Sequence, residues 1–272
     1  MSSLKVSIIC ACKNRNKPLY ASIGSWLLKK EVHEVIITDW SSDEQVYPIT
    51  NLDERVKVIR VDDQKYFNQP QPLNLAASIA TGDYILKFDS DYFFNPYEEY
   101  NFFNIYEIDK NSFLCGMADY DSDPRTKEPI FYYLRGLMYV SRENFIKVGG
   151  YNESESKYYG NEDDELIARL KKMGLHQKNM KQDYTIFHIP HTDKKRVENF
   201  EGFHTDKQMK DDVHSMMSQS FSGDELKWQE EYVLAQRHIY RNKQEYEQKY
   251  VSDKIKWQLD KIEDQYYKAQ KT

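Results

Sequence analysis

The sequence contains no apolar stretch long enough to cross a membrane. Residues 4–12 are apolar, but they fall far short of the roughly 20 residues that a membrane-spanning helix needs, and no signal-peptide pattern surrounds them. Only three cysteines are present, Cys10, Cys12 and Cys115, so they cannot all be paired. We therefore expect a reducing compartment, with the protein cytoplasmic or peripheral to the inner face of the membrane.

A long basic block is also missing. The formal net charge is −6, and binding to a phosphate backbone needs a clustered positive face, so nucleic acid is a poor candidate for the main partner. Hydrophobic residues make up 40% and charged residues 30% of the 272 residues, which is typical of a globular chain. This length suffices for a full core and favours one α/β domain with an appendage.

Strand-like and helix-like segments alternate in the first third of the chain. Apolar runs rich in β-branched residues predict strands over residues 5–12, 34–38, 56–61 and 84–88. Helical spacing of apolar residues predicts helices over 18–30 and 73–80, the second closed by Gly82 as its C-cap. The alternation favours a mostly parallel sheet with helices on both faces, in which ligands collect at the carboxyl ends of the strands. Polar clusters follow Cys12, Thr38 and Phe88, at those ends.

The last part of the chain has a different composition. From about residue 224 it is rich in Glu, Lys and Gln, with one apolar stripe at helical spacing that consists of Ile255, Leu259, Ile262 and Tyr266. We therefore expect a main domain over residues 1–220 and an amphipathic helical extension over 221–272. The stripe would pack on the main domain or permit a homodimer.

Two carboxylates leave the end of the fourth predicted strand together. Asp89 and Asp91 flank Ser90, and carboxylate oxygens suit Mg²⁺ or Mn²⁺, which can bridge a protein and a diphosphate. Such an ion would act as a Lewis acid for a leaving nucleotide diphosphate. An Asp-x-Asp also occurs in ordinary solvated turns, but its position directly after a strand favours a metal site.

A pair of histidines offers further metal ligands. His188 and His191 flank Ile-Pro after the strand-like residues 184–187. Imidazole suits Mn²⁺ better than Mg²⁺, so ligation by either histidine would favour Mn²⁺. The alternative is that each histidine is simply a polar residue with a satisfied partner.

An acidic run opens a predicted helix after Gly160. Glu162, Asp163 and Asp164 precede an apolar face formed by Leu166, Ile167, Leu170 and Met173. Acidic residues complement the dipole at a helix start, which accounts for one or two of the carboxylates. Three in succession also suit general-base catalysis on a sugar hydroxyl, provided that partial desolvation raises the pKa of the base.

Five motifs in order resemble the GT-A glycosyltransferases, above all the β-1,4-galactosyltransferase-like group and its bacterial family-2 relatives. They span about two thirds of the chain and read IICACKNRNKPL, YFNQPQPLNLAA, FDSDY, RGLMYVSRENFIKVGGYNE with YYGNEDDELIARL, and HIPH. The resemblance implies a Rossmann-like, mostly parallel mixed sheet flanked by helices. It also implies transfer of a sugar from a UDP-sugar donor, with Mn²⁺ or Mg²⁺ as cofactor.

Site residues follow from the resemblance position by position. Those implied to bind the donor are Ala11, Cys12, Lys13, Arg15, Asp39 at the uracil edge, Phe67, Asn68, Asn74, Asp89, Ser90, Asp91 and Gly136. Those implied to contact the acceptor or the sugars are Tyr133, Arg135, Tyr159, Gly160, Glu162 and Asp164. Asp163 corresponds to the catalytic base. The implied metal ligands are Asp91, His191, His188 in place of a thioether, and Asp89.

Several positions depart from the group's pattern. Cys12 replaces a phenylalanine, Gln69 an arginine, and Tyr159 a tryptophan, while Arg135 replaces the first glycine of a Gly-Gly pair. An arginine there suits contact with the donor diphosphate or with an acidic acceptor. The group's disulfide cysteines and membrane anchor are absent, as expected of a bacterial or viral cytosolic enzyme.

These observations predict a metal-dependent inverting transferase. It would move a hexose or N-acetylhexosamine, with galactose-type sugars favoured, to a glycan or other hydroxyl acceptor, as in polysaccharide biosynthesis. A retaining GT-A transferase and a non-catalytic sugar-binding domain on a transferase scaffold are the alternatives. A nucleotidyltransferase would usually need a glycine-rich first loop, which residues 13–15 lack.

Overall fold

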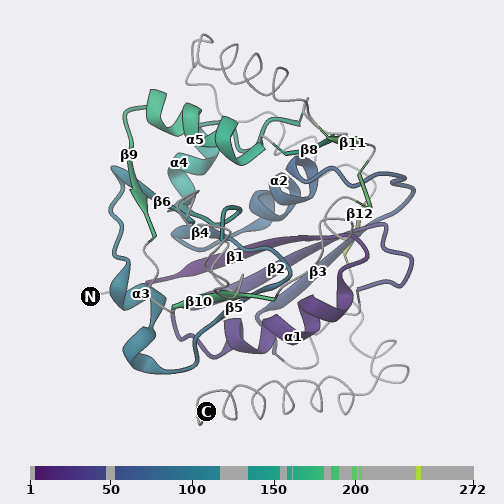
Figure 1. The fold of residues 1–272 in the computed structure, drawn as a ribbon, viewed down its shortest axis with the longest axis horizontal. Helices are drawn as coiled ribbons and strands as arrows, with labels where there is room; N and C mark the ends of the chain where they lie inside the picture. The colour runs from purple at the N-terminus through teal and green to yellow at the C-terminus, as the bar shows by residue number, and fades with distance from the viewer. Residues whose placement is uncertain are drawn as a thin grey trace, which may run out of the picture.

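The computed structural model describes residues 4–46, 53–116, 134–153, 158–160, 162–180, 185–189, 198–200, 202–203 and 237–239. Within these residues, eight strands form one sheet in the order β12-β3-β2-β1-β4-β7-β6-β9 (Figure 1). Their bounds are β1 Val6–Cys12, β2 Val32–Trp40, β3 Val56–Val61, β4 Tyr84–Lys87, β6 Ser112–Cys115, β7 Met138–Ser141, β9 His176–Asn179 and β12 Arg237–Ile239.

The sheet is mixed but mostly parallel, as predicted. Strands β3, β2, β1 and β4 run parallel, β7 runs antiparallel to both β4 and β6, and β9 is parallel to β6. In the register, Cys12 pairs with Asp39, and Asp39 pairs with Arg60. The carboxyl ends of the first three strands therefore meet at one edge, where polar residues follow each strand.

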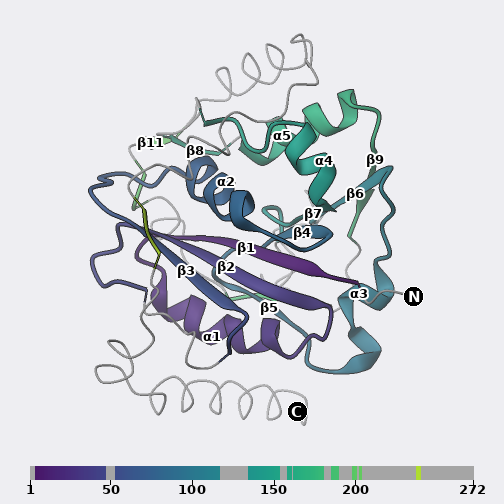
Figure 2. The same cartoon turned by 180° about the vertical axis from the view of Figure 1, so that it is seen from behind.

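Helices cover both faces of the sheet. The helices are α1 Asn16–Leu27, α2 Pro70–Ile79, α3 Phe102–Ile105, α4 Arg142–Lys147 and α5 Glu162–Lys172, with a 3-10 turn over Glu98–Tyr100. Figures 1 and 2 show α1 on one face, and α2, α4 and α5 on the other. Alternate residues of β1 serve the two cores, because Ile8 and Cys10 pack with α1, whereas Ile9 packs with α2.

Two small sheets complete the described fold. Strand β5 (Tyr92–Phe94) pairs antiparallel with β10 (Ile186–His188), and β8 (Tyr158–Tyr159) pairs parallel with β11 (Gly202–Phe203). The β5–β10 pair lies on the α1 side of the main sheet (Figure 1). Because β5 follows the Asp-x-Asp motif directly, this pair brings His188 next to that motif. No helix in the described part of the chain has the length and apolarity needed to cross a membrane.

The structure corrects one expectation, about the end of a helix, and adds a short strand near the C-terminus. Helix α2 ends at Ile79, with Ala80 extended, so Gly82 is not its C-cap. Gly82 instead lies against β1, where a Cβ would stand 2.7 Å from Ser7 Oγ and 2.9 Å from Lys5 O, so close approach of the two backbones requires glycine. In the expected C-terminal helical region, Arg237–Ile239 forms β12, antiparallel to β3. The remainder of 221–272 lies outside the described residues.

Candidate active site

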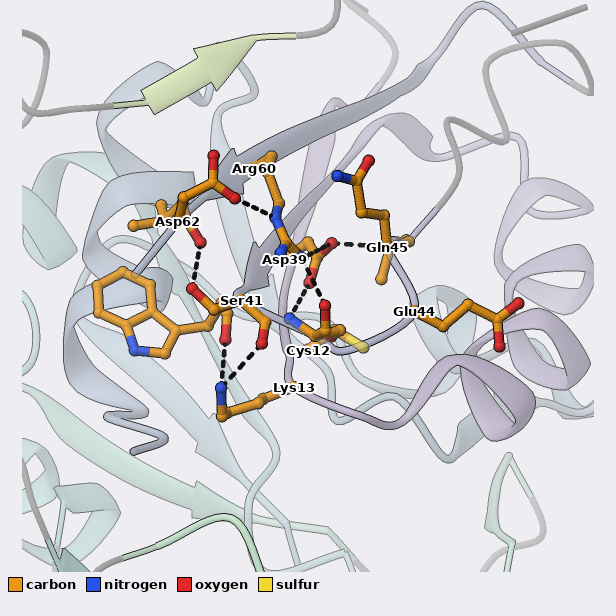
Figure 3. A network of polar contacts seen from close by, with 12 residues as sticks. Cys12, Lys13, Asp39, Ser41, Glu44, Gln45, Arg60 and Asp62 are labelled. Carbon is orange, nitrogen blue, oxygen red and sulfur yellow. Dashed lines mark hydrogen bonds and ion pairs between the residues drawn. The ribbon is translucent and has the colours of Figure 1, made fainter. Parts of the chain in front are cut away.

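The loop after β2 is organised by a buried carboxylate. Asp39 is completely buried and accepts hydrogen bonds from the backbone amides of Ser42, at 3.0 Å, and Val46, at 2.9 Å. Its Oδ2 also pairs with Arg60 Nη1 at 2.7 Å (Figure 3). Asp39 has no exposed surface in this structure, so contact between this carboxylate and a uracil ring stays a prediction.

The first loop is tied to the same network. Lys13, which is 6% exposed, donates to the carbonyls of Trp40 at 3.1 Å and Ser41 at 2.9 Å (Figure 3). It also donates to the carbonyl of Gln64 at 2.8 Å. Burial lowers the pKa of Lys13. Cys12 is buried next to it, and Ala11 is partly buried. Lys13 therefore holds three loop segments together at the edge where the nucleotide is expected.

Three residues expected to bind the donor lie just before α2 or within it. Phe67 stacks edge-on against Phe200 with ring centroids 5.2 Å apart, and the Asn68 side chain accepts from the Gln71 amide at 3.3 Å. Asn74 is fully buried and exchanges two 2.8 Å hydrogen bonds with the backbone of Tyr151. Asn74 thus connects α2 to the segment before α5. These contacts of Phe67, Asn68 and Asn74 hold parts of the chain together, so their contact with a donor stays a prediction.

The second aspartate of the motif lies between an arginine and a histidine. Asp91 is 4% exposed, and its Oδ2 lies 2.5 Å from Arg15 Nη2. Its Oδ1 lies 3.6 Å from Nε2 of His188, which is 3% exposed. Burial opposes ionisation of Asp91, but hydrogen bonding to His188 and the charge of Arg15 outweigh it and hold its pKa below the ordinary value.

Asp91 and His188 fit a divalent cation as two of its ligands. One supplies a carboxylate oxygen and the other an imidazole nitrogen, and the two atoms lie 3.6 Å apart. In the described part of the chain, no group of three or more His, Cys, Asp or Glu residues is arranged to hold a metal ion. His191, the other predicted imidazole ligand, lies outside the described residues. Arg15 supplies the positive charge next to Asp91 in this structure.

The first aspartate of the motif belongs to a different cluster. Asp89 Oδ1 is 2.9 Å from Nζ of Lys87, the last residue of β4, whose side chain is 1% exposed. The same ammonium lies 3.7 Å from Asp163 Oδ2, near the N-terminus of α5. The structure therefore brings the Asp-x-Asp motif and the acidic helix start together around one buried lysine.

Burial shifts the acids at the start of α5. It raises the pKa of Asp163 to about 6, against the opposing charge of Lys87, and Tyr151 Oη donates to Asp163 Oδ1 at 3.1 Å. Burial and the charge of Asp163 raise the pKa of Glu162 to about 8. Burial and mutual repulsion therefore favour the protonated forms of this pair, so the two acids ionise at a higher pH than ordinary carboxyls, as is typical of sites where one group acts as a base.

The remaining predicted residues have the following positions. Gly136 lies against the Lys87–Asp89 pair, because a Cβ there would stand 2.5 Å from Asp89 Oδ2. Arg135 Nη2 pairs with Asp164 Oδ2 at 2.9 Å, with both side chains partly exposed. Ser90 is buried, Gly160 has a φ of +102°, and Tyr159 belongs to β8. Tyr133 lies outside the described residues.

Sequence reasoning missed three residues of this site: Lys87, Tyr151 and Gln69. Lys87 has a signal, since it is the one charged residue in the apolar strand Tyr84–Lys87. The side-chain amide of Gln69 fits its surroundings in one orientation. In that orientation its oxygen accepts from Lys87 Nζ at 3.0 Å and its NH₂ group donates to Glu162 Oε1 at 3.1 Å. Gln69 was noted only as replacing an arginine of the resembling group, and its contact with Lys87 and Glu162, like the role of Tyr151, needed the tertiary structure.

Residues 7–152 match the family model described as glycosyl transferase family 2. This match covers more than half of the chain. The chain belongs to glycosyl transferase family 2. Residues 120–193 of this family-2 chain also match a model described as the N-terminal domain of galactosyltransferase. No curated protein sequence matches the chain.

Solved structures of similar fold include three useful comparisons. The catalytic domain of Drosophila β1,4-galactosyltransferase 7 with xylobiose superposes with a TM-score of 0.53 at 16% identity, covering 80% of this chain and 82% of that one. A mutant of that enzyme with manganese, UDP-Gal and xylobiose gives 0.53 at 17% identity, covering 76% and 79%. The mannosyltransferase PcManGT from Pyrobaculum calidifontis, with GDP-Man and Mn²⁺, gives 0.53 at 14% identity, covering 78% and 68%.

The similar structures support the fold assignment. The mostly parallel sheet with flanking helices matches the GT-A fold of these neighbours, which confirms the predicted fold class and family resemblance. The family-2 match and the fold together identify the chain as a glycosyltransferase. At identities of 14–17%, the superpositions establish the fold and leave donor and acceptor to be argued from the site.

Proposed function

We propose that this family-2 chain transfers a hexose or N-acetylhexosamine from a UDP-sugar to an acceptor hydroxyl, with inversion at the anomeric carbon. The observation that carries the proposal is the shared contact of Lys87 with Asp89 and Asp163. It places an Asp-x-Asp motif beside a carboxylate whose pKa is raised to about 6 by burial. Such a carboxylate is basic enough to accept a proton near neutral pH and is largely ionised there.

Each acidic group has a distinct task in this proposal. Asp163 takes the proton from the attacking hydroxyl, which approaches the anomeric carbon opposite the diphosphate. Asp91 and His188 would hold a divalent cation, with Mn²⁺ preferred because one ligand would be an imidazole. When bound, such an ion acts as a Lewis acid that offsets charge on the leaving diphosphate. Arg15, whose guanidinium lies 2.5 Å from Asp91, would pair with the diphosphate in this proposal.

The choice of donor rests on the neighbours and on the matched galactosyltransferase model. UDP-Gal is present in one neighbouring structure and GDP-Man in another. A thermal-shift screen of UDP-galactose, UDP-GalNAc, UDP-glucose, UDP-GlcNAc and GDP-mannose with Mn²⁺ distinguishes them, because a ligand specific to the folded state raises Tm by mass action. We expect the largest shift with a UDP-sugar. A larger shift with GDP-mannose would contradict the UDP assignment.

The stereochemical outcome has its own test. Inversion needs one base and a single displacement, so the product anomer should be opposite to that of the donor. Proton NMR of the first product formed reads the anomeric coupling directly. Retention of configuration would contradict the single displacement and favour a retaining GT-A transferase. Absence of both transfer and donor hydrolysis would favour a non-catalytic sugar-binding domain.

A further inference from the structure

A buried lysine lies at the centre of the candidate site. The Lys87 side chain is 1% exposed, at the end of β4 and on the face of the sheet covered by α2 and α5. A buried ammonium is costly unless it is paired and hydrogen-bonded, so its contacts must compensate for the loss of hydration. Lys87 is too buried to touch a substrate as the site stands.

The contacts of Lys87 come from three separate elements. Nζ lies 2.9 Å from Asp89 Oδ1 after β4, and 3.7 Å from Asp163 Oδ2 in α5. When the Gln69 amide is oriented so that its neighbours are satisfied, its oxygen accepts from this ammonium at 3.0 Å, and Gln69 directly precedes α2. Burial alone would lower the pKa of Lys87, but the charges of Asp163 and Asp89 outweigh burial and raise it. The lysine is therefore a permanent cation between two carboxylates.

The surrounding backbone is shaped to fit this cation. A Cβ at Gly136 would stand 2.7 Å from Lys87 Nζ and 2.5 Å from Asp89 Oδ2. A glycine at this position therefore leaves room for the ion pair. The opposite oxygen of Asp163 is held by Tyr151 Oη at 3.1 Å. Asp163 is thus fixed from two sides, by a cation at Oδ2 and by a hydroxyl at Oδ1.

We propose that Lys87 is a positioning residue that fixes the base Asp163 relative to Asp89, the first aspartate of the Asp-x-Asp motif. This inference rests on the proposed function, because it takes Asp163 as the base. Without the ammonium, two neighbouring carboxylates would repel each other and Asp163 would keep only its contact with Tyr151. The donor nucleotide would still bind, since Lys13, Arg15 and Asp91 lie elsewhere.

The expected signature is a loss of turnover with binding retained. Misplacing a reacting group by about 1 Å costs on the order of 10²-fold in rate, so Lys87→Met should lower kcat by about that factor. The Kd for UDP with Mn²⁺ should stay within about threefold of the wild-type value, because a residue that only positions the base does not contribute to ground-state binding of UDP. Lys87→Met combined with Asp163→Asn should be little worse than Asp163→Asn alone, since residues that act as a unit are not additive.

The experiment compares full-length wild type, K87M, D163N, the double variant and a matched control. Lys29→Met is the control, because Lys29 is also buried, at 4% exposure, but it follows α1 outside the site. Calorimetry with UDP and Mn²⁺ gives Kd. Release of UDP from UDP-galactose, or from another nucleotide sugar in the screen that is turned over, gives kcat and KM. If K87M fails to fold, Gly136→Ala crowds the same ammonium without removing its charge and should show the same loss of kcat.

The outcomes are distinct. A large loss of kcat in K87M with UDP affinity retained, and no change in K29M, supports the inference. A kcat within about twofold of wild type overturns it, and so does a parallel loss of UDP affinity, which would make Lys87 a support of the donor pocket. A wild-type protein that turns over no nucleotide sugar contradicts the proposed function itself, and the inference falls with it.

Discussion

The pH dependence of sugar transfer follows from the surroundings of Asp163. Burial raises the pKa of this carboxyl to about 6, while the charge of Lys87 and the hydrogen bond from Tyr151 hold it below a still higher value. A general base must be ionised to act, so activity is present above this pKa and is lost as the pH falls through it. With a pKa of about 6, the ionised fraction falls about tenfold between pH 7 and pH 5.

The assay is kcat/KM against pH for release of UDP, which reports the free enzyme. We expect an acid limb near pH 6 with unit slope. Tyr151→Phe removes a hydrogen bond that favours the ionised carboxylate, so its limb should move to higher pH. A wild-type limb near pH 4, the ordinary range of an exposed carboxyl, or a limb in Tyr151→Phe that stays in place, would refute the reasoning.

Three further predictions concern stability and metal binding. Burial opposes ionisation of Glu34, but hydrogen bonds from Lys57 and Thr81 outweigh it and lower the pKa of Glu34 to about 2. As the pH falls from 4.5 to 2, up to about 3 kcal/mol of the free energy of unfolding should therefore be lost. Urea unfolding of Glu34→Gln over the same pH range should lack this loss. Gly82→Ala should lower the free energy of unfolding by about 1–3 kcal/mol, because its Cβ meets β1. Arg15→Met should tighten Mn²⁺ binding without nucleotide about tenfold, the worth of one charge-assisted hydrogen bond to Asp91. Electron paramagnetic resonance of free Mn²⁺ measures this affinity, with the exposed Lys17→Met as control; equal affinities in the two variants would contradict the prediction.

The fold was largely predictable because its signals are local. The β-branched runs at β1 to β4 and the helical spacing in α1 and α5 depend on neighbouring residues, and parallel strands follow from their alternation with helices. The role of Gly82 was not predictable in this way. Its glycine is needed for close approach to β1, which is distant in sequence and is visible only in the folded chain.

The candidate site was predictable where a motif carries the chemistry. Asp89, Asp91, His188 and Asp163 were identified from residue type and order, and the structure brings Asp89 to Asp163 and Asp91 to His188. Asp39 was expected to contact the uracil, whereas its carboxylate in the structure binds Arg60 and two backbone amides.

Lys87 shows the limit of sequence reasoning about the site. Its partners are Gln69 just before α2, Asp163 in α5 and Asp89 in the loop after β4, and no pattern along one segment of the chain specifies such a meeting point. A lysine in an apolar strand signals an unusual environment, but only the folded structure identifies the carboxylates that it pairs with.

Asp163→Asn tests the central claim most directly. The variant keeps the size of the side chain and removes the basic oxygen, and general-base help is typically worth about 10² to 10⁴-fold in rate. Measured together on this variant, UDP affinity with Mn²⁺ should match the wild type while kcat falls by a factor in that range. Near-wild-type turnover with the same affinity would show that another group accepts the proton and would contradict the account.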